Sequence, residues 1–181
     1  MPALTLYSLC IPSMIRSLEN LSAILTKATD YASANNISPD TLITARLVAD
    51  MGPLPRQIQR ASDSAKGLAV RLCGHPPIAI PDNENTFEEL QERITKTIEI
   101  LKAVKPDSTD GKEDQLIEIA AGKNVWELTG TEYVQKFALP NFFFHVVTAY
   151  GILRAQGVPV GKLDYLGDAS MWVKQVPQGQ E

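Results

Sequence analysis

Residues 131–167 read TEYVQKFALPNFFFHVVTAYGILRAQGVPVGKLDYLG. An apolar segment is interrupted at Pro140, resumes with three phenylalanines and a histidine, and runs on to Gly157. This pattern predicts a buried helix with a kink at Pro140, because proline has no amide hydrogen and its ring clashes with the preceding turn. The polar side chains of His145 and Tyr150 lie on this helix among apolar neighbours. We therefore expect the helix to line any site that the protein has.

Apolar residues that recur at spacings of three and four predict three further long helices upstream. They cover about residues 4–35, 53–73 and 86–106, and a short helix from residue 38 to about Asp50 separates the first two. The second and third long helices carry the repeat that is typical of helical bundles. The fold class that follows is all-α, a four-helix bundle.

The segment 115–129 breaks the helical pattern just before the last helix. Two short apolar runs on either side of Gly122 favour a β-hairpin, with a frayed helix as the alternative. After Gly157 the apolar residues of the tail are expected to pack across the bundle. Residues 1–175 are expected to form one domain, and residues 176–181 a disordered tail.

Composition and charge argue against several classes of function. The chain has 181 residues, 44% of them hydrophobic, and a net charge of −4 without a basic stripe, so nucleic acid is not an expected partner. No apolar run approaches the roughly 20 residues that a membrane span needs, and the N-terminus lacks the positive region of a signal peptide. With only two cysteines, Cys10 and Cys73, a reduced cytoplasmic protein is the expectation. Motifs of hydrolases and nucleotide-binding loops do not occur.

Two blocks of the sequence resemble a known family. RLVADMGPLPRQIQRASDSAK at residues 46–66 and ALPNFFFHVVTAYGILRAQGVPVGKLDYLG at residues 138–167 are similar to a bacterial and fungal group of proteins of unassigned function. That group is placed with the DinB/YfiT-like bundles, a fold to which metalloenzyme activity is attributed. The resemblance covers about residues 4–167 and implies a DinB-like bundle.

In the wider DinB-like fold, three histidines typically hold a divalent metal, one from the second helix and two at HxxxH spacing from the last. Here His145 corresponds to the first member of that pair, but the residue four positions on is Ala149. The second helix has no histidine, and its nearest candidate is Gln57, since His75 lies past the helix end. The sequence retains at most one of the three ligands, so we predict no metal ligands and no cofactor.

His145 and Asp50 are the candidate catalytic residues. A histidine in apolar surroundings has a lowered pKa and stays neutral, and a carboxylate can orient it as a base. Asp50 can pair with Arg46 or Arg154 as well as with His145, and the alternative for His145 is a core histidine bonded to a buried carboxylate. Asp63 is expected to form a surface pair with Lys66, three residues on.

Four residues are candidates for ligand binding: Gln57, Phe144, Thr148 and Tyr150. Gln57 can reach the interior, where its amide must find polar partners. Thr148 shares a helical face with His145, whereas Tyr150 points about 140° away from it.

The leading hypothesis is a small organic molecule bound in an apolar pocket between the last helix and the second, with His145 as the polar anchor and as an acid–base group that needs no metal. Two alternatives stay open. One is a metal-dependent enzyme of the thiol-transferase type found among DinB-like proteins. The other is a non-catalytic structural or interaction protein, dimeric through its bundle faces.

Overall fold

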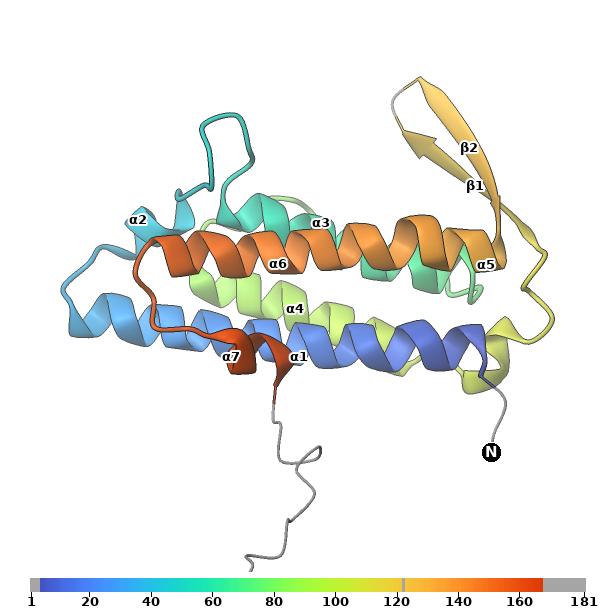
Figure 1. Cartoon of the computed structure of the whole chain (residues 1–181), viewed down its shortest axis with the longest axis horizontal. Coiled ribbons are helices and arrows are strands. Elements are labelled where there is room, and N and C mark those ends of the chain that lie inside the picture. The colour runs from blue at the N-terminus through green and yellow to red at the C-terminus, as the bar shows by residue number, and fades with distance from the viewer. Residues whose placement is uncertain (1–3, 122, 168–181) are drawn as a thin grey trace, which may run out of the picture.

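The structure, a computed structural model, describes residues 4–121 and 123–167. Four long helices lie side by side and enclose a single apolar core (Figure 1). They are α1 (Leu6–Ala34), α3 (Leu54–Arg71), α4 (Phe87–Lys102) and α6 (Leu139–Ala155). The predicted all-α bundle with a hairpin before its last helix is therefore confirmed. The expected tail at 176–181 lies outside the described residues.

Helices α1 and α4 begin where their sequences place good N-caps. The hydroxyl of Thr5 accepts a hydrogen bond from the amide of Ser8 at the start of α1, and that of Thr86 accepts one from Glu89 at the start of α4. Pro12 lies inside α1, beyond the first turn in which it would be least disruptive. The regular apolar spacing of both helices places their core stripes against each other.

The short helix after residue 38 ends earlier than expected. The helix α2 covers only Pro39–Ile43, and the chain then forms a loop over residues 44–53. Two residues of this loop, Leu47 and Val48, are about half exposed, at 48% and 52%. The predicted extension to about Asp50 was wrong, because Leu47 and Val48, which a longer helix would have to bury, stay exposed.

The predicted hairpin is present and projects from one end of the bundle (Figure 1). Strands β1 (Leu116–Ala121) and β2 (Asn124–Thr129) pair antiparallel, with Leu116 opposite Thr129. The chain passes from β2 into α5 (Gly130–Glu132) through a capping box at Thr129.

The interruption before α6 takes the form of π-helical turns. The segment η2 (Tyr133–Ala138) has these wider turns immediately before Pro140, which sits in the first turn of α6. The helical backbone continues through this point, and the wider turns before Pro140 accommodate a residue that has no amide hydrogen and whose ring clashes with the preceding turn.

Residues 158–166 cross the bundle as expected. Val158 and Val160 are buried in the core, and the chain then forms the short helix α7 (Lys162–Leu166) against α1, which the sequence pattern did not predict. A carbonyl of α7, that of Tyr165, accepts a hydrogen bond from the Asn20 side chain on α1 at 3.0 Å.

A four-residue 3-10 turn, η1 (Pro106–Thr109), connects α4 to the segment before the hairpin. Of the described helices, none combines the length and the apolar character needed to cross a membrane.

Candidate functional site

His145 lies on α6 where that helix packs against α3. Its side chain is half-buried, and its Nδ1 atom lies 2.9 Å from the Oε1 atom of Gln57 on α3. Gln57 itself is only 4% exposed, as its predicted reach into the interior requires. The two residues are 88 positions apart in the sequence, so the packing of α3 on α6 alone brings them together.

The orientation of the Gln57 amide determines which nitrogen of His145 carries the proton. The Nε2 atom of Gln57 donates a hydrogen bond to the carbonyl of Gly52 at 2.8 Å, so the Oε1 atom must face the imidazole. A carbonyl oxygen only accepts, and the Nδ1 atom of His145 must therefore be the donor. In the neutral ring this leaves Nε2 as a lone-pair acceptor, and no described residue donates a hydrogen bond to it.

The imidazole is held in its neutral form. Burial lowers the pKa of His145 below its ordinary value of 6.5, and the positive charges of Arg60 and Arg56 lower it further. Both arginines are on α3, one residue before and three residues after Gln57. His145 thus combines the lowered pKa that its apolar surroundings predicted with a positive electrostatic potential that no sequence pattern predicted.

The predicted ligand-binding residues on α6 separate into two groups. Phe144 is 55% exposed, and its ring stands edge-on to the His145 imidazole with centroids 5.1 Å apart. Thr148 is buried, and its hydroxyl donates to the carbonyl of Phe144 within the same helix at 2.7 Å. Tyr150 packs against Tyr165 of α7, with ring centroids 6.2 Å apart. Of these three residues, Phe144 therefore offers His145 the most accessible neighbouring surface.

Asp50 is not brought to His145. It lies exposed in the loop 44–53, and the Nδ1 atom of His145 is bonded to Gln57 instead. Arg46, which with Arg154 was one of its two other expected partners, donates to the carbonyls of Ala49 and Met51 at 3.3 Å each. The alternative of a buried carboxylate bonded to His145 is also replaced, because the partner on α3 is an amide.

A second polar pair links α3 to α6 near His145. The side-chain amide of Asn141 donates to the hydroxyl of Ser64 at 2.6 Å, and that hydroxyl donates to the carbonyl of Arg60 at 2.8 Å. Asn141 precedes His145 by four residues, which is the spacing that sets two side chains on one helical face. That spacing was the signal that could have identified it from the sequence.

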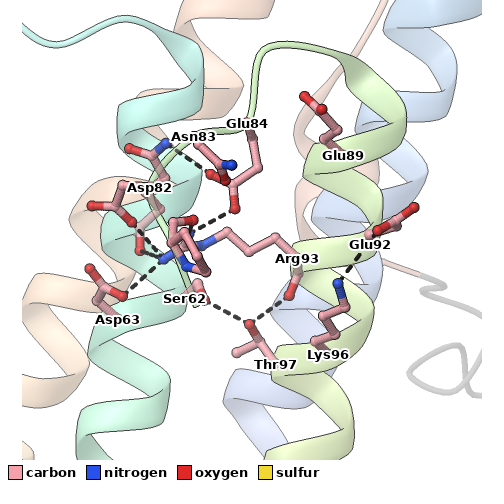
Figure 2. A network of polar contacts seen from close by, with 12 residues as sticks. Ser62, Asp63, Asp82, Asn83, Glu84, Glu89, Glu92, Arg93, Lys96 and Thr97 are labelled. Atoms are coloured by element: carbon pink, nitrogen blue, oxygen red, sulfur yellow. Dashed lines mark hydrogen bonds and ion pairs between the residues drawn. The ribbon is translucent and has the colours of Figure 1, made fainter. Parts of the chain in front are cut away.

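An ion cluster centred on the buried Arg93 lies between α3, α4 and the loop 80–85 (Figure 2). The guanidinium of Arg93 on α4 is wholly buried and pairs with Asp63, Asp82 and Glu84 at 2.9, 3.0 and 2.8 Å. Lys66 also contacts Asp63, at 3.1 Å, with a side chain only 11% exposed. The Asp63–Lys66 pair is therefore not the surface pair that was expected but part of this cluster.

The cluster controls the ionisation of Glu84. Burial alone would raise the pKa of this carboxyl, but hydrogen bonds from Arg93 and from the Gln59 amide outweigh it and hold the pKa below 4.5. Arg93 occupies the apolar seam of α4, three residues after the buried Leu90. A charged residue in such a seam is the sequence signal for a buried ion pair, since an unpaired charge there would be costly.

An open apolar groove of about 550 Å³ lies away from His145, between α4 and the segment 75–81. This is not the position that the sequence predicted for a pocket, which was between the helices now seen as α3 and α6. Residues of the groove are His75, Ile78, Ala79, Ile80, Pro81, Lys96, Glu99, Ile100 and Ala103.

The donors around His145 do not suit the divalent metal that a DinB-like fold implies. Across residues 4–121 and 123–167, no three His, Cys, Asp or Glu side chains gather so as to hold a metal ion. The Oε1 atom of Gln57 already accepts from Nδ1, and the position four residues after His145 is the buried methyl group of Ala149. Arg56 and Arg60 add positive charge, which repels a dication.

Comparison with known proteins places the chain among relatives of unassigned function. The model of a family described as "Domain of unknown function (DUF1993)" matches residues 6–166. A crystal structure of a DinB family member from Shewanella denitrificans is 38% identical, with a TM-score of 0.83, and the match covers 90% of this chain and 92% of that one. A search of curated proteins finds no match.

Proposed function

This chain belongs to the DUF1993 family and has the fold of a DinB family member, and from that premise we propose that it binds a small organic molecule at His145. The observation that carries the proposal is the hydrogen-bond chain from the Gly52 carbonyl through Gln57 to the Nδ1 atom of His145. It leaves the Nε2 atom as an acceptor whose orientation is fixed by the buried side chain of Gln57.

A ligand that donates a hydrogen bond fits this acceptor. The neutral imidazole accepts a hydrogen bond from a hydroxyl, amide or thiol group, and in a reactive complex it takes the proton as a general base. The exposed ring of Phe144 supplies an apolar surface beside it. Because His145 is only half-buried where α6 meets α3, the ligand would approach from the exposed side of this contact.

A binding screen tests the proposal. The chain has two histidines, His145 and His75, so each serves as the control for the other. Saturation-transfer NMR with a set of neutral hydroxyl- and amide-bearing fragments should reveal compounds that bind the native protein, bind His75→Ala equally well, and lose binding to His145→Ala. A screen whose hits all bind His145→Ala as well as the native protein would overturn the proposal, as would a screen without hits. Thermal melting of each variant shows that the substitution leaves the fold intact.

A further inference from the structure

The ion cluster centred on Arg93 holds more positive than negative groups. Among the described residues, the cations of Arg56, Arg60, Lys66 and Arg93 are joined by contacts within 4 Å to only three carboxylates, those of Asp63, Asp82 and Glu84. The four cations therefore share three negative charges.

The carboxylates of Asp63 and Asp82 lie closer to the buried Arg93 than to the exposed arginines of the cluster. Arg93, with no exposed side-chain surface, holds Asp63 and Asp82 at 2.9 and 3.0 Å (Figure 2). The contacts of Arg56 to Asp82 and of Arg60 to Asp63 are longer, at 3.3 and 3.5 Å. An unpaired charge on the desolvated guanidinium of Arg93 would be costly, so the two carboxylates pair more closely with Arg93 than with Arg56 or Arg60. Arg56 and Arg60 are left incompletely neutralised.

These two arginines stand one helical turn apart on α3, on the same stretch as Gln57, the hydrogen-bond partner of His145. They flank Gln57 on α3, and their side chains are 44% and 42% exposed. The charges that act on the imidazole are those of Arg60 and Arg56, both positive. Where a metal-binding member of the fold would attract a cation, this chain presents guanidinium groups, which bind carboxylates through paired N–H donors.

We propose that the ligand of this site is a small hydroxy-carboxylic acid, whose carboxylate binds Arg56 and Arg60 and whose hydroxyl donates to the Nε2 atom of His145. This inference rests on the proposed function and specifies its ligand class. The ring of Phe144 favours an acid with an apolar or aromatic body. The same positive charge disfavours amines and metal dications.

Mandelate and its methyl ester test the charge. Both carry the same phenyl ring and hydroxyl, and only mandelate is an anion. Each is titrated against the native protein while the imidazole signals of His145 are followed by NMR, with His75→Gln used for assignment. We expect mandelate to shift the His145 signals saturably and to bind about fivefold more tightly than the ester, since solvent screens ion pairs with arginines as exposed as these.

Substitutions of the arginines test whether they cause the preference for mandelate. Arg56→Gln combined with Arg60→Gln should reduce mandelate affinity to that of the ester. Lys136→Gln removes an exposed cation from η2 and should leave both affinities unchanged. Thermal melting shows whether each variant is folded.

Two outcomes overturn the inference, and they differ in what they leave standing. Equal binding of mandelate and its ester at His145 refutes the charged ligand class but supports the proposed function. Absence of any His145 response to either compound refutes the hydroxy-acid class, while the neutral-fragment screen decides the proposed function separately.

Discussion

The Nδ1 atom of His145 lies 2.9 Å from the Oε1 atom of Gln57, and this contact joins the last helix to the second long helix. Because the other end of the Gln57 amide donates to the Gly52 carbonyl, the contact determines the tautomer of the histidine. A buried amide thus takes the orienting role that a carboxylate has in many acid–base sites, and it does so without raising the pKa of the imidazole.

Stability should fall with acid as His145 is forced to accept a proton. Its folded pKa lies below the unfolded value of 6.5, so the unfolded chain binds the proton first. The contribution is complete above pH 6.5 and is lost as pH falls from 6.5 through the folded pKa. Urea unfolding between pH 8 and 5 should show this decline in the native protein and a smaller one in His145→Asn. Equal slopes for the two proteins would contradict the neutral assignment.

Replacing Gln57 by glutamate should reverse the ionisation of His145. Gln57→Glu retains the shape of the side chain but puts a negative charge beside the Nδ1–H group, so the pKa of His145 should rise above 6.5. Stability from this pair is then full below pH 6.5 and is lost as pH rises through the new folded pKa. NMR titration of the imidazole measures the change. Gln57→Leu is the matched uncharged control, and its His145 pKa should stay low.

Removing Arg93 should strongly destabilise the fold. Arg93→Met leaves the buried carboxylate of Glu84 without its cation, a loss that typically costs about 3–5 kcal/mol. Lys102→Met breaks an exposed pair with Glu19, and its cost should be within about 1 kcal/mol. Denaturant unfolding at pH 7 compares the two variants. A cost for Arg93→Met as small as that for Lys102→Met would show that Glu84 finds another partner or becomes protonated.

The thiol of Cys10 should be inert in the folded protein. Burial, with a smaller effect from Cys73, raises the pKa of Cys10 to about 12, and its Sγ atom donates to the Leu6 carbonyl at 2.8 Å. Cys73 is partly exposed, so a thiol reagent at pH 8 should modify it first. Modification of Cys10 should proceed only at the rate of unfolding, and Cys10→Ser should remove that slow phase alone. Rapid reaction of both thiols would refute the burial of Cys10.

Local patterns could predict most of the architecture but only part of the site. The position of His145 on an apolar helix and the inward reach of Gln57 followed from helical spacing. The position of Asp50 could not be predicted from helical spacing, because Asp50 lies in a loop. Contacts such as those of Arg46 with the Ala49 and Met51 carbonyls determine the shape of that loop. The charges of Arg56 and Arg60 were visible in the sequence, but their bearing on His145 depends on how α3 faces α6.

The sequence by itself determined the bundle, the hairpin and the helix that carries His145, because each of these depends on apolar spacing and capping within a short stretch of chain. Only the tertiary structure decided which polar groups meet. Gln57 reaches His145 across 88 residues, and Arg93 gathers carboxylates from α3 and from the loop 80–85. Hydrogen bonds and ion pairs act over about 3 Å, so they depend on the rotation and axial offset of packed helices. No periodic pattern encodes those two quantities.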